Sequence, residues 1–122
     1  MKFLYLLSFL LAVVAVNGDK YSTENDDFDI DAAAADIETL KGLVGCFLDT
    51  AACSAPGADF KKDIPEATKT ECAKCTDAQK HIYHKFLEAL KEKLPSDYEA
   101  FKKKYDADGK HFESLEAAVA KS

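Results

Sequence analysis

Four cysteines are the residues of this chain whose type and spacing could do chemistry. They are Cys46, Cys53, Cys72 and Cys75, in the spacing C-x6-C-x18-C-x2-C. Four thiolates could hold a zinc ion, the C-x2-C pair could act as a redox dithiol, and four oxidised cysteines could form two structural disulfides. The cellular compartment decides among these interpretations, because thiols stay reduced in the cytosol and are oxidised in secreted proteins.

The N-terminus has the pattern of a cleavable signal peptide, which we assign to residues 1–18. Lys2 gives a positive start, and an almost unbroken apolar run follows. This run has the length of a signal-peptide core and is short for a membrane span, so a retained anchor helix is the less favoured alternative. We expect cleavage after Gly18, with Ala15 as the second candidate. The protein is then secreted and extracellular, not stably inserted in a membrane, and consists of one domain, residues 19–122.

Export favours structural disulfides over the other two interpretations. A zinc site would combine the C-x2-C half with an unusually wide C-x6-C half and would need free thiols. A thioredoxin-like pair at Cys72 and Cys75 would need a βαβ unit, and the sequence has no strand-like alternation. Loop entropy favours a long-range bridge, about 3.5 kcal/mol for Cys46–Cys75, over local bridges of about 2 to 2.5 kcal/mol each. Loop entropy therefore gives no reason of its own for local pairing.

No other group of residues predicts a catalytic site or a metal site. His81 and His84 share a helical face, but no third ligand or nucleophile accompanies them, so they and His111 are expected at the surface. Residues 106–109, Asp-Ala-Asp-Gly, resemble the centre of a calcium loop, but a lysine and a leucine would take its two end positions, where acidic ligands are needed. We therefore expect a turn there, no metal, no cofactor and no enzymatic activity.

The charge of the chain argues against nucleic acid as a partner. The formal net charge is −6, and removal of Lys2 with the leader changes it to −7. Every basic residue is a lysine, whereas bidentate recognition of phosphate and guanine depends largely on arginine. An acidic chain without arginine is better suited to high solubility.

The elements that must position these residues are expected to be helices. After an acidic, extended arm over residues 19–29, apolar residues recur at helical spacing. The fold class is therefore all-α, a compact bundle of about six short amphipathic helices. They are expected over residues 31–35, 37–48, 60–67, 77–93, 96–105 and 112–119.

Several residues predict where these helices begin and end. Thr76 with Gln79 and Ser96 with Glu99 predict two capping boxes. Segment 55–57, Ala-Pro-Gly, predicts a break in the chain. Pro65 predicts a kink or a break after the residue that precedes it.

Short motifs along nearly the whole expected mature chain carry a family resemblance. They are Tyr21-Ser22-Thr23, Asp29-Ile30-Asp31, Val44-Gly45-Cys46-Phe47-Leu48-Asp49, Asp63-Ile64-Pro65-Glu66-Ala67, Glu71-Cys72-Ala73-Lys74-Cys75 and Lys104-Tyr105-Asp106 with Gly109. In these motifs and in its cysteine spacing the chain resembles the insect chemosensory proteins, small secreted four-cysteine carriers. The resemblance implies six helices around an apolar channel and disulfides Cys46–Cys53 and Cys72–Cys75. It also implies binding of long-chain fatty acids, alcohols, esters and similar semiochemicals.

Three features depart from the family pattern. Leu43 stands where many members have a tyrosine near the pocket mouth, and Tyr98 stands where a tryptophan is common. The first helix is the alanine run 32–35 instead of a segment rich in isoleucine and leucine. We expect these changes to affect the choice of ligand more than the fold.

The channel wall is expected to comprise eight residues, whereas Leu40, Phe47 and Leu90 are expected to be plain core. The eight are Leu43, Val44, Ile64, Ile82, Phe86, Tyr98, Phe101 and Tyr105. The leading hypothesis is a monomeric secreted carrier of hydrophobic small molecules, with a receptor as a further candidate partner. The alternative is a secreted signalling or structural factor in development, reproduction or defence that acts through a protein partner.

Overall fold

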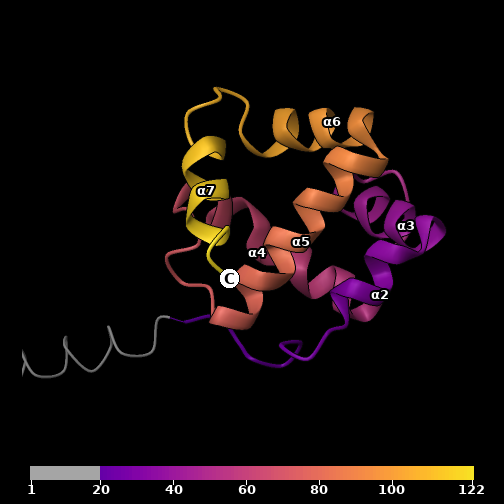
Figure 1. Cartoon of the computed structure of the whole chain (residues 1–122), viewed down its shortest axis with the longest axis horizontal. Coiled ribbons are helices and arrows are strands. Elements are labelled where there is room, and N and C mark those ends of the chain that lie inside the picture. Colours follow the sequence, from indigo (N-terminus) through magenta and orange to yellow (C-terminus); the bar gives the residue numbers. More distant parts are fainter. Residues whose placement is uncertain (1–19) are drawn as a thin grey trace, which may run out of the picture.

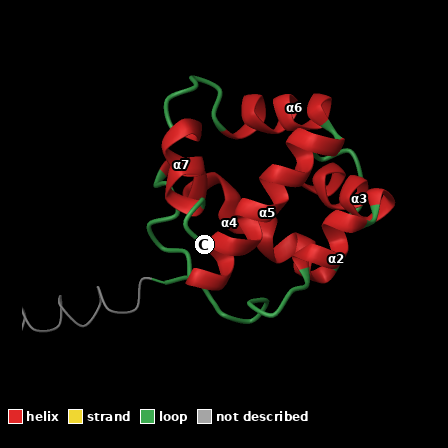
Figure 2. Ribbon diagram, in the orientation of Figure 1, coloured by secondary structure: helices red, strands yellow, loops and turns green. Residues whose placement is uncertain are grey.

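Residues 20–122 fold into six helices joined by loops, in a computed structural model that describes this part of the chain (Figures 1 and 2). The predicted leader and its cleavage sites lie outside the described residues. No strand occurs between residues 20 and 122, which confirms the all-α class. The helices are α2 (Ile30–Ala35), α3 (Ile37–Phe47), α4 (Ala55–Lys69), α5 (Asp77–Lys93), α6 (Pro95–Tyr105) and α7 (Phe112–Val119).

Helix α5 runs through the middle of the bundle and contacts α2, α6 and α7 (Figure 1). Its start is the capping box predicted from sequence: the Gln79 backbone N–H donates to Thr76 Oγ1 at 3.1 Å, and the Thr76 N–H donates to Gln79 Oε1 at 2.9 Å. One face of α5 is buried. This face gives the short helices around it a common surface to pack on, which they need because isolated short helices are marginal in water.

Phe101 of α6 is the centre of an aromatic cluster in the core. It is 0% exposed, and its ring centroid lies 5.5 Å from that of Phe86, 6.1 Å from that of Phe112 and 6.3 Å from that of Phe47. Edge-to-face and tilted pairs at such distances are the favoured aromatic geometries. Helices α3, α5, α6 and α7 thus share one core.

Helix α4 differs from the sequence prediction at both ends. It begins at Ala55, where Ser54 Oγ accepts the Gly57 N–H at 3.2 Å, so the Ala-Pro-Gly segment starts a helix instead of breaking the chain. Proline is tolerated in the first helical turn, where its missing N–H is not needed. Of the kink or break predicted at Pro65, the break is wrong, because α4 continues to Lys69. Ala67 and Thr68, which follow the proline, are 4% and 0% exposed, and their burial favours continuation of the helix.

The second predicted capping box, Ser96 with Glu99, is also wrong. Helix α6 begins at Pro95, ahead of the predicted N-cap residue Ser96, and no side chain caps it. Ser96 therefore already lies inside the first turn. The turn predicted near Gly109 is present, with Gly109 at φ 70°, a conformation that glycine adopts without strain.

The N-terminal arm, residues 20–29, turns back at residues 24–27 and is held against the bundle, so it is not extended over its whole length as predicted. The Tyr21 N–H donates to the Lys74 carbonyl at 3.0 Å, and Gln79 Nε2 donates to the Ser22 carbonyl at 2.7 Å. The Phe28 ring packs edge-on against the Phe60 ring, with centroids 5.3 Å apart. The arm therefore covers one side of helices α4 and α5.

Both disulfides join neighbouring cysteines, Cys46 to Cys53 and Cys72 to Cys75, with Cα–Cα distances of 4.8 and 4.9 Å. The long-range pairing is thereby excluded. Residues 20–122 contain no helix with the length and apolar character needed to cross a membrane.

Candidate ligand-binding pocket

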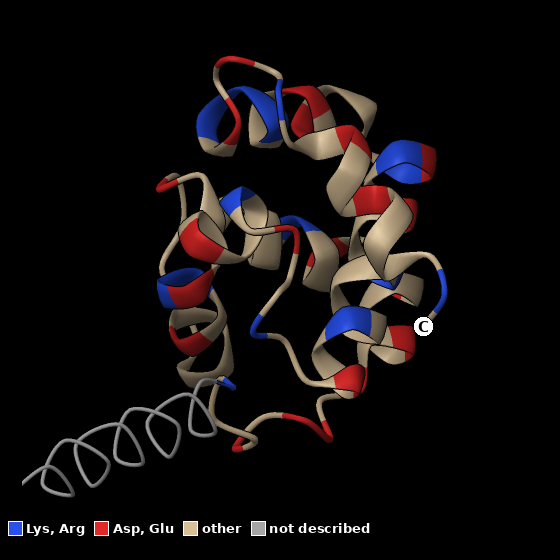
Figure 3. Ribbon diagram, turned by 90° about the vertical axis from the view of Figure 1, so that its left-hand side faces the viewer, with Lys and Arg blue, Asp and Glu red and all other residues tan. Residues whose placement is uncertain are grey.

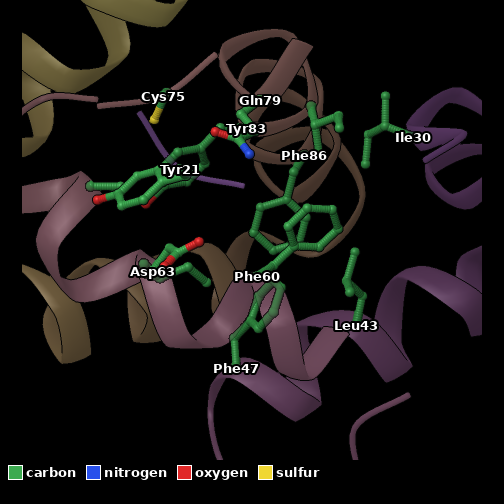
Figure 4. A pocket seen from close by; sticks show the side chains of 13 residues that line it. Tyr21, Ile30, Leu43, Phe47, Phe60, Asp63, Cys75, Gln79, Tyr83 and Phe86 are labelled. Atoms are coloured by element: carbon green, nitrogen blue, oxygen red, sulfur yellow. The ribbon is translucent and has the colours of Figure 1, made fainter. Parts of the chain in front are cut away.

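A cavity of about 70 Å³ lies between the N-terminal arm and helices α2, α3, α4 and α5 (Figure 4). Its wall is mostly aliphatic and aromatic. The residues that line it are Tyr21, Ile30, Leu43, Phe47, Phe60, Asp63, Ile64, Ala67, Cys75, Gln79, Ile82, Tyr83 and Phe86.

Two helical stripes supply most of this wall. Helix α4 contributes residues 60, 63, 64 and 67, and helix α5 contributes residues 79, 82, 83 and 86. Both sets have the spacing i, i+3, i+4, i+7, which places four side chains on one face of an α-helix. The cavity is the space that these two faces share.

The polar and apolar parts of the wall are separated. Figure 4 shows Tyr21, Asp63 and Gln79 at one end of the pocket, and Ile30 and Leu43 at the other. Such an arrangement suits an elongated molecule with one polar end, because a ligand pocket is usually apolar with a few polar groups that fix orientation.

Most polar side chains of the wall already have hydrogen-bond partners. Tyr21 Oη donates to Glu66 Oε1 at 2.9 Å, and the Tyr83 hydroxyl lies 2.8 Å from Thr68 Oγ1. Burial raises the pKa of both tyrosines above their ordinary value, and the bond to Glu66 raises that of Tyr21 further. Both hydroxyls therefore stay neutral at physiological pH.

Asp63 is the exception. Within residues 20–122 its carboxylate has no hydrogen-bond or ion-pair partner, although it is partly buried. Burial raises the pKa of Asp63, and the charges of Glu66 and Asp59 raise it further, while Lys62 opposes them. The cavity thus has one unpaired acidic group in its wall.

Comparison with known proteins identifies the family. Residues 21–113 match the insect pheromone-binding family, A10/OS-D. The chain belongs to this family. The resemblance to insect chemosensory proteins predicted from the motifs is confirmed.

Relatives of the A10/OS-D family match most of the chain. Ejaculatory bulb-specific protein 3 of Drosophila melanogaster is 32% identical, over 88% of this chain and 86% of that protein. Allergen Tha p 1 of Thaumetopoea pityocampa is 35% identical, with the same coverage of 88% and 86%.

Solved structures show the same arrangement of helices. A chemosensory protein in complex with bromo-dodecanol has a TM-score of 0.74 and 26% identity, over 80% of this chain and 98% of that chain. Antennal chemosensory protein A6 from the moth Mamestra brassicae has a TM-score of 0.67 and 24% identity, over 83% and 94%, and it shows the fold alone.

The pocket of this A10/OS-D protein contains four of the eight residues predicted for the channel wall. Leu43, Ile64, Ile82 and Phe86 line the cavity, and Phe47, predicted to be plain core, lines it as well. Phe47 is a core residue as well as a wall residue: its side chain is 3% exposed, and its ring packs on that of Phe86, with centroids 5.3 Å apart.

The other four predicted residues do not line this cavity. Val44 and Phe101 are 1% and 0% exposed in the core. Tyr98 turns towards α7, where its hydroxyl donates to Glu116 Oε2 at 2.9 Å, and Tyr105 Oη donates to the Phe47 carbonyl at 2.6 Å. Tyr98, Phe101 and Tyr105 belong to α6, which contributes no residue to the wall of this cavity.

Besides Phe47, the sequence prediction left out eight residues of the wall. Those on α4 and α5 complete the two helical stripes, so the spacing around Ile64 and Ile82 was the signal that could have found them. Tyr21 had no such signal, since its position depends on how the arm folds. The eight are Tyr21, Ile30, Phe60, Asp63, Ala67, Cys75, Gln79 and Tyr83.

Asp106, Asp108 and His111 form a cluster outside the pocket, with potential ligand atoms within 4.8 Å of one another. Asp106 Oδ2 accepts the backbone N–H groups of His111 at 3.0 Å and Phe112 at 2.8 Å. The first backbone N–H groups of a helix have no acceptor within the helix. At the start of α7, Asp106 supplies this acceptor. The cluster is explained by helix capping.

Proposed function

We propose that this chain is a secreted carrier that binds a long-chain apolar molecule in the cavity between the arm, α4 and α5. The observation that carries the proposal is an apolar cavity with its few polar side chains gathered at one end. It is supported by a protein of the same fold that is known in complex with bromo-dodecanol, a molecule of that shape.

The apolar wall could supply most of the binding free energy. Burial of each CH₂ group contributes about 0.8 kcal/mol, so a chain of about 16 carbons gains on the order of 12 kcal/mol. Loss of translational freedom and ordering of the ligand offset several kcal/mol of this gain. Affinities around micromolar follow.

The cavity must enlarge to take such a chain. Its volume of about 70 Å³ is below that of an engineered apolar cavity of about 150 Å³ that holds benzene. Opening would separate the arm from α4 and α5. We propose that the ligand contacts the residues that line the cavity. Contact with Val44, Tyr98, Phe101 or Tyr105 stays a prediction for the opened form.

Displacement of a neutral fluorescent lipid probe tests the proposal. We expect alcohols, acids and esters of 12 to 18 carbons to include strong competitors, with dissociation constants around micromolar. The reduced chain unfolded in urea is the matched control and should not bind the probe. Failure of the folded protein to bind the probe and every competitor would contradict the proposal.

We also propose export as a monomer without residues 1–18. N-terminal sequencing of the protein purified from its source should begin at Asp19, and native mass spectrometry should give the monomer mass with any lipid retained. A start at residue 1 would contradict export by this route.

The alternative, a secreted signalling or structural factor acting through a protein partner, is favoured by one observation. One relative is named as specific to the ejaculatory bulb, a tissue that is not a sensory organ. Localisation of the transcript and protein by tissue separates the two functions: sensory tissue favours odorant carriage, and glandular or epidermal tissue favours the alternative or another kind of transport.

A further inference from the structure

The polar end of the pocket has one side chain free to bind a ligand headgroup. Tyr21 and Tyr83 are paired as described, and the Gln79 amide is used twice, through Nε2 to the Ser22 carbonyl at 2.7 Å and through Oε1 from the Thr76 N–H at 2.9 Å. Of these four side chains, Asp63 alone has no partner within residues 20–122. Figure 4 shows it beside Tyr21.

The surroundings of Asp63 are acidic on both helix and arm. A polar hollow shares Phe60, Asp63 and Gln79 with the pocket, and it is also lined by Ser22, Glu24, Asn25, Asp59 and Lys62. Figure 3 shows the acidic residues along the arm at the lower edge of the molecule. A negatively charged headgroup would therefore meet Asp63 inside the pocket and Glu24 and Asp59 in the adjoining hollow.

Of the cations close to this end, Lys62 opposes the acidic charges around Asp63, but it does not line the pocket. Lys62 is exposed and faces the hollow, and Lys74 pairs with Glu66 at 3.3 Å. Glu66 also accepts from Tyr21. A carboxylate ligand would have no cation in the cavity wall to pair with.

We infer that Asp63 is a specificity-determining residue, which accepts a hydrogen bond from a long-chain alcohol and disfavours the corresponding fatty-acid anion. An ionised carboxylate is an acceptor only, so it can bind a hydroxyl donor and repels a second carboxylate. An ester, which is neutral and has no donor, falls between them. This inference rests on the proposed carrier function and names the class of ligand.

The test compares dodecanol with dodecanoate as competitors of a neutral fluorescent lipid probe, at pH 8 and below the solubility limit of each. This pH lies about four units above the ordinary carboxyl pKa near 4, which keeps the acid and Asp63 ionised although burial raises the pKa of Asp63. We expect wild-type protein to bind dodecanol at least about tenfold more tightly. Methyl dodecanoate should have an intermediate affinity.

The Asp63→Asn variant decides the cause of that preference, because water also solvates an anion better than an alcohol. This substitution keeps the shape and removes the charge, so the alcohol-to-acid ratio should fall at least about fivefold. Glu92→Gln, which removes one charge from an exposed position on α5, is the matched control and should keep the wild-type ratio. Thermal unfolding followed by circular dichroism confirms that each variant is folded.

The outcomes separate this inference from the proposed function. Binding of the probe and both competitors with equal affinity in wild-type protein, or an unchanged ratio in D63N, overturns the role of Asp63 and leaves the carrier function intact. Absence of binding by the probe and all competitors overturns both. A fall in the ratio in D63N but not in E92Q supports the inference.

Discussion

Two aspartates in different surroundings show how a carboxylate can serve folding or ligand choice. Asp106 is buried and accepts two backbone N–H groups at the start of α7. Asp63 is partly buried and has no such partner among the described residues, so it is free for a headgroup. Burial raises the pKa of both, but in Asp106 the hydrogen bonds outweigh it and the pKa lies below its ordinary value.

Replacement of Asp106 by alanine is expected to destabilise the protein, because the backbone N–H groups of His111, which precedes α7, and of Phe112, its first residue, lose their acceptor. We expect a melting temperature several degrees lower at pH 7, measured by circular dichroism. Asp108→Ala is the matched control, since Asp108 is exposed and its Oδ1 accepts only the Lys110 N–H, at 3.1 Å. Equal effects of the two substitutions would contradict the capping role.

The stabilising effect of Asp106 should depend on pH. Its folded-state pKa is below the unfolded value of about 3.9, so its contribution is fully present above about pH 4 and is lost as pH falls through the folded-state pKa. The difference in melting temperature between wild-type and D106A protein should therefore narrow below pH 4. A difference that stayed constant down to pH 2 would exclude this linkage.

At the scale of elements, helix α3 contains two glycines with opposite surroundings. A Cβ atom added to Gly45 would lie 2.9 Å from Ala51 Cβ, because the chain turns back on α3 and both Thr50 and Ala51 donate to the Gly45 carbonyl. A Cβ atom added to Gly42 would meet nothing within 4 Å. Only Gly45 is required by packing.

The two alanine substitutions should therefore change stability in opposite directions. Gly42→Ala is expected to raise the free energy of unfolding by about 0.5 to 1 kcal/mol, the usual gain in helix propensity. Gly45→Ala is expected to lower it by about 1 to 3 kcal/mol through overpacking. Urea denaturation of both variants measures the difference, and a stabilised G45A protein would show that the turn after α3 can move away.

Sequence periodicity predicted most of this fold because the helices bury stripes of regular spacing. Phe112, Leu115 and Val119 mark α7, and all three are buried. The start of α4 was missed because its first turn has no apolar stripe. The break at Pro65 was predicted because proline lacks a backbone N–H and disrupts helices, but burial of the following turn favours a continuous helix.

The pocket was harder to predict than the fold. A helical stripe shows which face is buried, but it does not show whether another side chain or an empty space lies opposite that face. Ile82 lines the cavity and Phe101 fills the core, although both are apolar residues at helical spacing. The position of Tyr21 depends on contacts of the arm with α4 and α5, which are distant in sequence.

At the scale of the whole molecule, two local disulfides stabilise a small bundle of short helices. They span sequence separations of 7 and 3 residues, and loop entropy assigns them about 2.5 and 2 kcal/mol. Each is a sizeable part of the 5 to 15 kcal/mol typical of a folded domain.

Removal of either bridge should lower the free energy of unfolding by these amounts, measured in urea on the double cysteine-to-alanine variants. Only the C72A/C75A variant should also change the affinity for dodecanol, because Cys75 lines the pocket and neither Cys46 nor Cys53 does. Full stability of a variant would show that packing alone holds that segment, and a large loss of affinity in C46A/C53A would contradict the assignment of the pocket.

The cavity leaves part of the interior unfilled, which lowers stability, and we expect that this space serves ligand binding. Ala67 lines the cavity and is 4% exposed, whereas Ala89 is 6% exposed and lies away from it. Ala67→Leu should fill the space without loss of stability and weaken dodecanol binding at least about tenfold. Ala89→Leu, the matched control, should cost about 1 to 3 kcal/mol by overpacking and leave the affinity nearly unchanged. Because the two substitutions add the same atoms to buried sites, wild-type affinity in A67L would mean that the ligand binds elsewhere.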